Sequence, residues 1–156
     1  IDLTSPAEPF AIYKNLDILR NAFKDAQNIA VSKGYEMIEF DTTKAVYDNF
    51  LERMRRSYAV ILTSLGDISP NMIFDAIMVG TPFILTKENG ITERVKDCAI
   101  FVDPMNKEDI VEKIIWISDP KNRAIQAEKI KNFNWVHTWA DIGMEIISLH
   151  SKLLLK

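Results

Sequence analysis

Two aspartates beside a serine-proline-asparagine turn are the residues best suited to chemistry in this chain. Asp67 and Asp75 are eight positions apart, and Ser69, Pro70 and Asn71 lie between them. A carboxylate can accept hydrogen bonds from two neighbouring hydroxyls, as on a ribose or a hexose. The spacing also fits a simpler interpretation, in which Asp67 helps to cap a helix and Asp75 lies on its solvated surface.

A strand and a helix start are predicted on either side of Asp67. The run from Tyr58 to Leu62 is apolar and rich in β-branched residues, which is typical of a buried parallel strand. Ser69 followed by Pro70 predicts a helix start, with the Ser69 hydroxyl as the cap and proline at the first helical position. Because a helix N-terminus presents unpaired amides and a positive dipole end, this turn is suited to an anion.

The helix that follows is bounded by glycine. It is predicted over Asn71 to Met78, and Gly80 is suited to the left-handed turn after a helix. Pro82 then opens the next apolar strand, which runs to Leu85. Asp67 would therefore lie in the loop and Asp75 near the second turn of the helix, so that the two acids bracket the anion-binding helix start.

This pattern resembles the nucleotide-sugar-binding core of GT-B glycosyltransferases. In their large retaining family (group 1), the C-terminal domain carries Glu, seven residues, Glu, Ala and then Gly-Thr-Pro. The matching residues here are Asp67, Asp75, Ala76 and the run Gly80-Thr81-Pro82. The resemblance implies an α/β fold, a Rossmann-like three-layer α/β/α domain with a mostly parallel sheet. It also implies metal-independent transfer of a hexosyl unit from a UDP- or GDP-linked sugar to an acceptor, without a cofactor.

The resemblance also implies roles for single residues. Asp67 would contact the donor sugar and act in catalysis, and Asp75 would bind the ribose hydroxyls. Lys14 precedes a segment similar to the family's opening helix, so it would bind the donor diphosphate. The helix-start residues would bind the same diphosphate, and they are Ser69, Asn71 and Met72.

A second stretch adds two donor-binding candidates. The segment from Thr86 to Pro104 resembles the family's loop, short Glu-bearing helix and last strand. Gly90 would let backbone amides approach a sugar or phosphate, because it lacks a Cβ. Glu93 would accept from a sugar hydroxyl, although a first-turn glutamate that stabilises its own helix explains it equally well.

Three departures from the family pattern motivate a second hypothesis. Both motif acids are aspartates where the family has glutamates, and Glu8 to Phe10 stand where the family has glycine and arginine. The span from Phe23 to Tyr35 is also shorter than in the family. A degenerate GT-B domain with an assembly or regulatory role is therefore the alternative, and a nucleotide-sugar epimerase of the same fold is a third hypothesis.

The remaining elements follow from hydrophobic periodicity and turn residues. Residues 1–9 are predicted as a linker or irregular segment, and residues 10–156 as one Rossmann-like domain. The helix predicted at Asn15 to Lys33 has an alternative, in which a short strand at Asn28 to Val31 splits it. The predicted elements are a strand at Phe10 to Tyr13, a helix at Asn15 to Lys33, a strand at Tyr35 to Phe40, a helix at Thr43 to Ser57, a strand at Ala99 to Val102, and helices at Lys107 to Ser118 and Asn122 to Lys131.

Composition excludes several other classes of protein. The 156 residues are 47% hydrophobic, which suits one compact domain. A net charge of −3 argues against a nucleic-acid partner. One cysteine, Cys98, fits a reducing cytoplasm, and with only two histidines, His137 and His150, we expect no zinc site.

The chain begins at Ile1 without a methionine, so we expect a fragment of a longer protein whose N-terminal Rossmann domain is missing. No apolar stretch reaches the roughly 20 residues of a transmembrane helix. Peripheral contact with a membrane is a further expectation for the full-length protein. Near the end, Phe133 to Trp135 resembles the family's lead into a last helix, and Leu153 to Leu155 would pack on the missing partner. Trp135 and Trp139 are expected to anchor the core.

Overall fold

A parallel sheet forms the centre of the molecule. The computed structural model describes residues 2–4, 15–35, 39–41, 46–133 and 138–154. All described strand pairings are parallel, and the strand order is β2-β1-β3-β4-β5. The strands are β1 (Asp2–Thr4), β2 (Glu39–Asp41), β3 (Ala59–Leu62), β4 (Phe83–Thr86) and β5 (Ile100–Val102).

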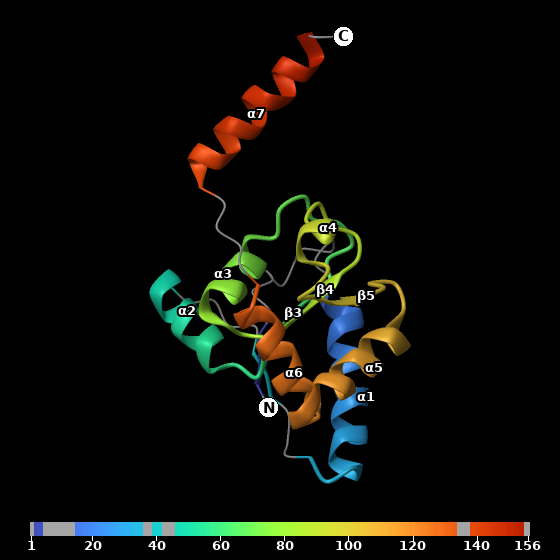
Figure 1. Ribbon diagram of the computed structural model, residues 1–156. Helices are drawn as coiled ribbons and strands as arrows, with labels where there is room; N and C mark the ends of the chain where they lie inside the picture. The colour runs from blue at the N-terminus through green and yellow to red at the C-terminus, as the bar shows by residue number, and fades with distance from the viewer. Residues whose placement is uncertain (1, 5–14, 36–38, 42–45, 134–137, 155–156) are drawn as a thin grey trace.

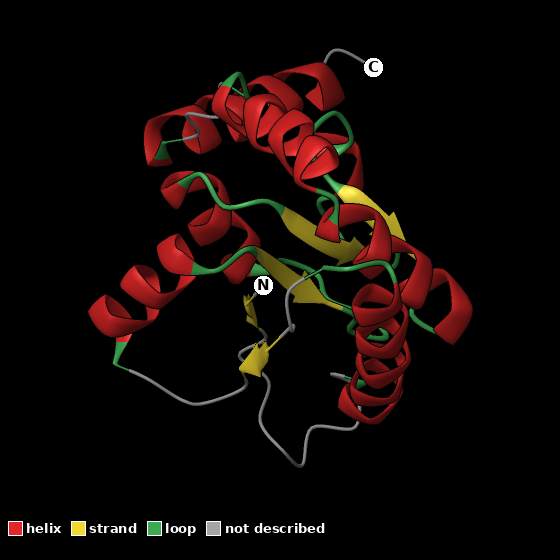
Figure 2. Cartoon of the chain, turned by 90° about the horizontal axis from the view of Figure 1, so that it is seen from below, coloured by secondary structure: helices red, strands yellow, loops and turns green. Residues whose placement is uncertain are grey.

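Helices cover both faces of this sheet (Figure 1, Figure 2). Side chains of α1 and α5 form one core cluster with the sheet, and side chains of α2, α3, α4 and α6 form the other. The predicted three-layer α/β/α fold is thereby confirmed. The helices are α1 (Leu16–Ser32), α2 (Tyr47–Arg56), α3 (Asn71–Val79), α4 (Thr92–Val95), α5 (Lys107–Ser118), α6 (Pro120–Lys131) and α7 (Trp139–Leu154).

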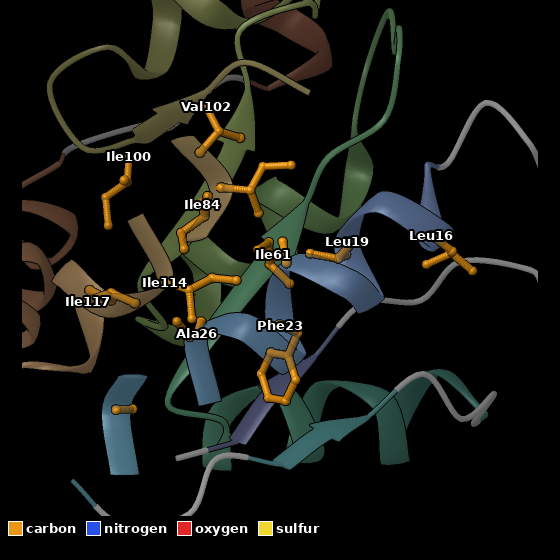
Figure 3. Close-up of a cluster of buried hydrophobic side chains, with 14 residues drawn as sticks. Leu16, Leu19, Phe23, Ala26, Ile61, Ile84, Ile100, Val102, Ile114 and Ile117 are labelled. Carbon is orange, nitrogen blue, oxygen red and sulfur yellow. The ribbon is translucent and has the colours of Figure 1, made fainter. Parts of the chain in front are cut away.

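Strand β3 shows why the central strands are apolar on both faces. Ala59 and Ile61 belong to the cluster beneath α1 and α5, whereas Val60 and Leu62 belong to the opposite cluster. Figure 3 shows Ile61 among the side chains of the first cluster, which include Leu19 of α1. A strand buried on both faces needs apolar residues at every position, and this is the pattern that predicted it.

The position of the first strand corrects one prediction. Residues 2–4 were expected in a linker, but β1 lies inside the sheet and pairs with both β2 and β3. A three-residue strand has too short a side-chain pattern to be recognised, and its backbone pairing on both sides depends on distant segments. The predicted strand at Phe10 to Tyr13 lies outside the described residues.

Helix α1 is continuous from Leu16 to Ser32, so the alternative strand at 28–31 is wrong. Gly34 follows in the left-handed conformation, with φ 77°, as expected for a helix end. At its start, Asn15 is also left-handed, with φ 59°, and its side-chain amide donates to the Pro104 carbonyl at 2.6 Å. Asparagine is one of the few non-glycine residues that adopt this conformation readily.

The other element boundaries differ by a few residues. The described part of the predicted strand at 35–40 contributes β2, which extends one residue further to Asp41. Within the predicted helix at 43–57, α2 begins at Tyr47, and residues 42–45 are not described. Helix α6 begins at Pro120 rather than Asn122, because Asp119 accepts a hydrogen bond from the Lys121 amide and proline occupies the first helical position.

Helix α7 extends away from the other helices (Figure 1). His150 is exposed on it. Its large apolar side chains are mostly exposed, and these are Met144, Ile146, Ile147, Leu149, Leu153 and Leu154. The predictions for Trp135, His137 and the Trp139 side chain fall outside what the structure describes.

Candidate functional site

The carboxyl edge of the sheet gathers most of the predicted site residues. In a parallel sheet, the loops that follow the strands lie at one edge, where ligands of open α/β folds bind. The loop after β3 carries Asp67 and Ser69, and the loop after β4 carries Gly90. These two loops are joined to each other directly, as the next contacts show.

Asp67 is half-buried and fixed by its backbone. Its N–H donates to the Glu88 carbonyl at 3.3 Å, and its carbonyl accepts from the Gly90 N–H at 2.9 Å. These contacts form an isolated parallel bridge between Asp67 and Asn89. One carboxylate oxygen, Oδ1, also accepts from the Ser69 N–H at 3.3 Å. The position of Asp67 therefore depends on the loop after β4.

Asn89 holds the other side of this bridge, and the sequence reasoning missed it. Its Oδ1 accepts from the Ile91 N–H at 2.8 Å, and its side-chain amide donates to the Thr86 carbonyl at 2.5 Å. The Thr92 hydroxyl donates to the Lys87 carbonyl at 3.1 Å. An asparagine beside a glycine in a loop is the signal that would have indicated it, since its side chain commonly bonds nearby backbone groups.

Gly90 is required by the protein itself. A Cβ at this position would lie 2.1 Å from the Ile68 carbonyl oxygen, which no side chain tolerates. Its N–H is bonded to Asp67. The two properties that suggested a ligand contact, the missing Cβ and the amide, thus both serve the pairing of the two loops.

The start of α3 corrects the predicted cap. Pro70 is the N-cap residue, with φ −73° and ψ 88°, and its side chain makes no capping hydrogen bond. Ser69 is exposed and bonds Asp67 through its amide instead of capping through its hydroxyl. Because Pro70 is itself the N-cap and not the first helical residue, Ser69 stands one position before the capping position. The end of α3 matches the prediction, because Gly80 is left-handed, with φ 79°.

The first turn of α3 presents its amides at the carboxyl edge. The first amides of an α-helix have no partner within the helix, and the helix dipole makes this end positive. Asn71 is exposed, and the Met72 side chain is buried in the core. Only the backbone of Met72 is therefore suited to a ligand contact.

Asp75 lies in the second turn of α3 and is half-buried. Its Oδ1 accepts a hydrogen bond from the Tyr47 hydroxyl at 2.7 Å, from the first turn of α2. This hydrogen bond, together with desolvation and the nearby charge of Asp75, raises the pKa of Tyr47 above its usual range. Asp75 is thus held between two helices, and Tyr47 is a second residue that the sequence reasoning missed.

The remaining candidates contribute less. Glu93 is in the first turn of α4, and its side chain is 87% exposed and lies 3.3 Å from the Lys96 ammonium. This geometry favours the simpler interpretation of Glu93 as a helix-stabilising residue. Lys14 lies outside the described residues.

Two more polar features lie at the carboxyl edge. Lys87, after β4, pairs with Asp103, after β5, at 2.8 Å. Their hydrogen bond raises the pKa of Lys87 and lowers the pKa of Asp103.

Thr63 and Ser64 follow β3, and their hydroxyl oxygens are buried without a hydrogen-bond partner among the described residues.

Two surface hollows lie away from these residues. One, of about 760 Å³, follows α6 and includes Ile125 and Phe133, and the other, of about 420 Å³, lies between α1 and α5.

Where the structure describes the chain, no three side chains of the metal-binding types are grouped to hold an ion. No helix in the described ranges combines the length and apolarity needed to cross a bilayer.

Comparisons with known proteins identify the fold. No protein-family model matches the sequence, and no curated protein matches it. WaaG, a glycosyltransferase involved in lipopolysaccharide biosynthesis, has a similar solved structure, with a TM-score of 0.64 and 15% identity over 85% of this chain and 42% of that chain.

Two further solved structures are similar. Sucrose-phosphate synthase from Thermosynechococcus elongatus gives a TM-score of 0.63 at 12% identity, over 99% of this chain and 45% of that chain. The catalytic domain of cholesterol-α-glucosyltransferase from Helicobacter pylori gives a TM-score of 0.62 at 17% identity, over 84% of this chain and 95% of that chain. The chain thus spans less than half the length of WaaG and of the synthase. Together these likenesses confirm the expected architecture, and the chain has the fold of a GT-B glycosyltransferase domain.

Proposed function

We propose that this chain is the donor-binding domain of a retaining, metal-independent glycosyltransferase that acts in the cytoplasm. The observation that carries the proposal is the arrangement of Asp67, Asp75 and the α3 N-terminus at the carboxyl edge of a GT-B-like sheet. The substrate would be a UDP- or GDP-linked sugar, and the reaction would transfer its hexosyl unit to an acceptor.

Each group has a part in the proposal. Asp75 would accept hydrogen bonds from the ribose hydroxyls, and Asp67 would bind the donor sugar next to the reacting carbon. The α3 amides and Lys14 would bind the diphosphate. When the glycosidic bond breaks, negative charge develops on the leaving diphosphate, and preorganised amides and a cation stabilise that charge.

The acceptor would bind a second domain that this chain lacks. The short coverage of the larger neighbours supports this, since the chain matches 42% of WaaG and 45% of the synthase. The exposed apolar residues of α7 would pack on that second domain. We therefore expect the isolated chain to bind a donor nucleotide without turning over a nucleotide sugar.

Isothermal titration calorimetry with UDP, GDP and ADP tests the proposal. Asp75→Asn should weaken binding of the preferred nucleotide by on the order of 1 to 3 kcal/mol, because charge-assisted hydrogen bonds to the ribose are lost. Asp48→Asn is the matched control, since Asp48 is an exposed acid in the first turn of α2 next to Tyr47. Equal affinity of the wild type and folded Asp75→Asn would show the ribose assignment to be wrong.

The alternative is a degenerate domain with an assembly or regulatory role. The internal use of the Gly90 amide and the exposure of Glu93 favour it, because two expected donor contacts are engaged elsewhere or solvated. An absence of measurable heat at millimolar nucleotide would support this alternative. Product analysis on the full-length protein would distinguish transfer from epimerisation.

A further inference from the structure

The bond between Tyr47 and Asp75 joins two helices at the nucleoside end of the proposed site. The Tyr47 hydroxyl donates to Asp75 Oδ1 at 2.7 Å across 28 residues of sequence. Tyr47 is 57% exposed, so water could satisfy its hydroxyl without any protein partner. The bond therefore results from where the two helices place these side chains, and not from a need to satisfy a buried group.

The helix that carries Tyr47 is anchored to α3 further along. Met54 of α2 is fully buried in one core cluster with Ile73 and Ala76 of α3. The Thr81 hydroxyl, just after α3, also donates to the Met54 carbonyl at 2.8 Å. Since α2 and α3 are packed together beyond the Tyr47 contact, the backbone of Tyr47 is held beside α3, within reach of Asp75.

The contact leaves the charge of Asp75 available. Among the described residues, Asp75 takes part in no ion pair, and its hydrogen-bond donor is a neutral phenol. A carboxylate has two oxygens, each able to accept. Tyr47 is bonded to Oδ1, so Oδ2 is the oxygen that a ligand hydroxyl would meet.

We propose that Tyr47 is a positioning residue of the donor site, whose hydroxyl orients Asp75 so that the second carboxylate oxygen accepts from ribose hydroxyls. The inference rests on the proposed function and deepens it, because it adds a residue from α2 to the recognition of the ribose. An aspartate on a helix surface has several side-chain rotamers, and a bond that fixes one of them removes an ordering cost from ligand binding. Tyr47 thus acts through Asp75 and need not touch the ligand.

The test compares Tyr47→Phe with the wild type in calorimetric titrations. The probes are whichever of UDP and GDP binds the wild type more tightly, and the 2′,3′-dideoxy form of the same diphosphate. We expect Tyr47→Phe to raise the Kd of the ribonucleotide about three- to tenfold, the value of one lost hydrogen bond, and to leave the Kd of the dideoxy form unchanged. In an Asp75→Ala background, which has no acceptor for the Tyr47 hydroxyl, Tyr47→Phe should have no further effect.

Tyr58→Phe is the control variant, because its hydroxyl also donates to one protein oxygen, the Ser118 carbonyl, at the opposite edge of the sheet. It should leave both Kd values unchanged. Unchanged or tighter ribonucleotide binding by Tyr47→Phe, or an equal loss for both probes, would overturn the role of Tyr47 while leaving the proposed function intact. If the wild type binds neither probe, the proposed function itself fails, and the role of Tyr47 fails with it.

Discussion

Gly90 and Asp67 are coupled through the backbone, and this coupling decides which substitutions the site tolerates. The Gly90 amide bonds the Asp67 carbonyl, while the Ile68 carbonyl occupies the space of a Cβ. Any side chain at position 90 would push apart the two loops that hold Asp67. Gly90, which has no side chain, can thus control the position of Asp67, the residue proposed to bind the donor sugar.

Gly90→Ala is predicted to lower the free energy of unfolding by about 1 to 3 kcal/mol, because the backbone must shift to relieve the overlap with Ile68. Gly66→Ala is the matched control in the loop after β3, next to Asp67. A Cβ there meets no atom within 4 Å, so a change of less than about 0.5 kcal/mol is expected. Urea denaturation of both variants measures the difference, and equal stabilities would contradict the account.

Helices α2 and α3 behave as one unit on their face of the sheet. They follow parallel strands and are bonded at Tyr47–Asp75 near their starts and at Met54–Thr81 near their ends. The second of these bonds is buried, and Thr81 is only 3% exposed. Local order around the proposed site therefore depends on contacts at both ends of this pair.

Thr81→Val is predicted to destabilise the fold by about 1 kcal/mol, because a buried hydrogen bond is lost while the volume is kept. Thr63→Val is the matched substitution. The Thr63 hydroxyl is buried without a hydrogen-bond partner among the described residues, so its loss should be neutral or stabilising. In chemical denaturation, the free energy of unfolding should fall for Thr81→Val and stay the same or rise for Thr63→Val. A loss of equal size at both positions would refute the prediction.

The sequence predicted α3 and its flanking strands well because their signals are local. Pro70 marks the start of α3 within one residue, Gly80 marks its end, and the strands on either side are continuous apolar runs. Strand β1 has no such pattern, because it is three residues long and is a strand only through its pairing with β2 and β3.

The site was predictable to the same extent. The places of Asp67 and Asp75 relative to α3 follow from the sequence, because the loop and the helix are continuous in the chain. The Tyr47–Asp75 bond spans 28 residues and depends on how two helices pack, which no local pattern encodes. The Asn89-Gly90 pair is a local turn signal, but the bridge from Asn89 to Asp67 was missed because it joins segments that follow different strands.

The whole molecule consists of a layered body and a protruding helix. The body buries apolar side chains on both faces of the sheet, while α7 leaves most of its own exposed. Ile146, Ile147 and Leu149 are each at least 60% exposed. The stability of the body should therefore be nearly independent of α7.

Ending the chain after residue 137 is predicted to change the free energy of unfolding by less than about 1 kcal/mol, because the large apolar side chains described on α7 are mainly exposed. Self-association should decrease in sedimentation velocity, since an exposed apolar surface is removed. Leu19→Ala is the sensitivity control. Leu19 is a fully buried residue of α1, so its truncation should lower the free energy of unfolding by about 2 to 5 kcal/mol. A truncated chain that loses as much stability as Leu19→Ala would show that α7 packs on the body.

Cys98 gives the chain a practical property. It is the single cysteine, it is fully buried, and burial raises the pKa of its thiol to about 11. At neutral pH it is therefore protonated and shielded from maleimides, since the thiolate is the nucleophile. A cysteine introduced at the exposed Ser151 would take a fluorophore selectively, and the anisotropy of that fluorophore would report whether α7 tumbles independently or becomes immobilised when the proposed second domain is added.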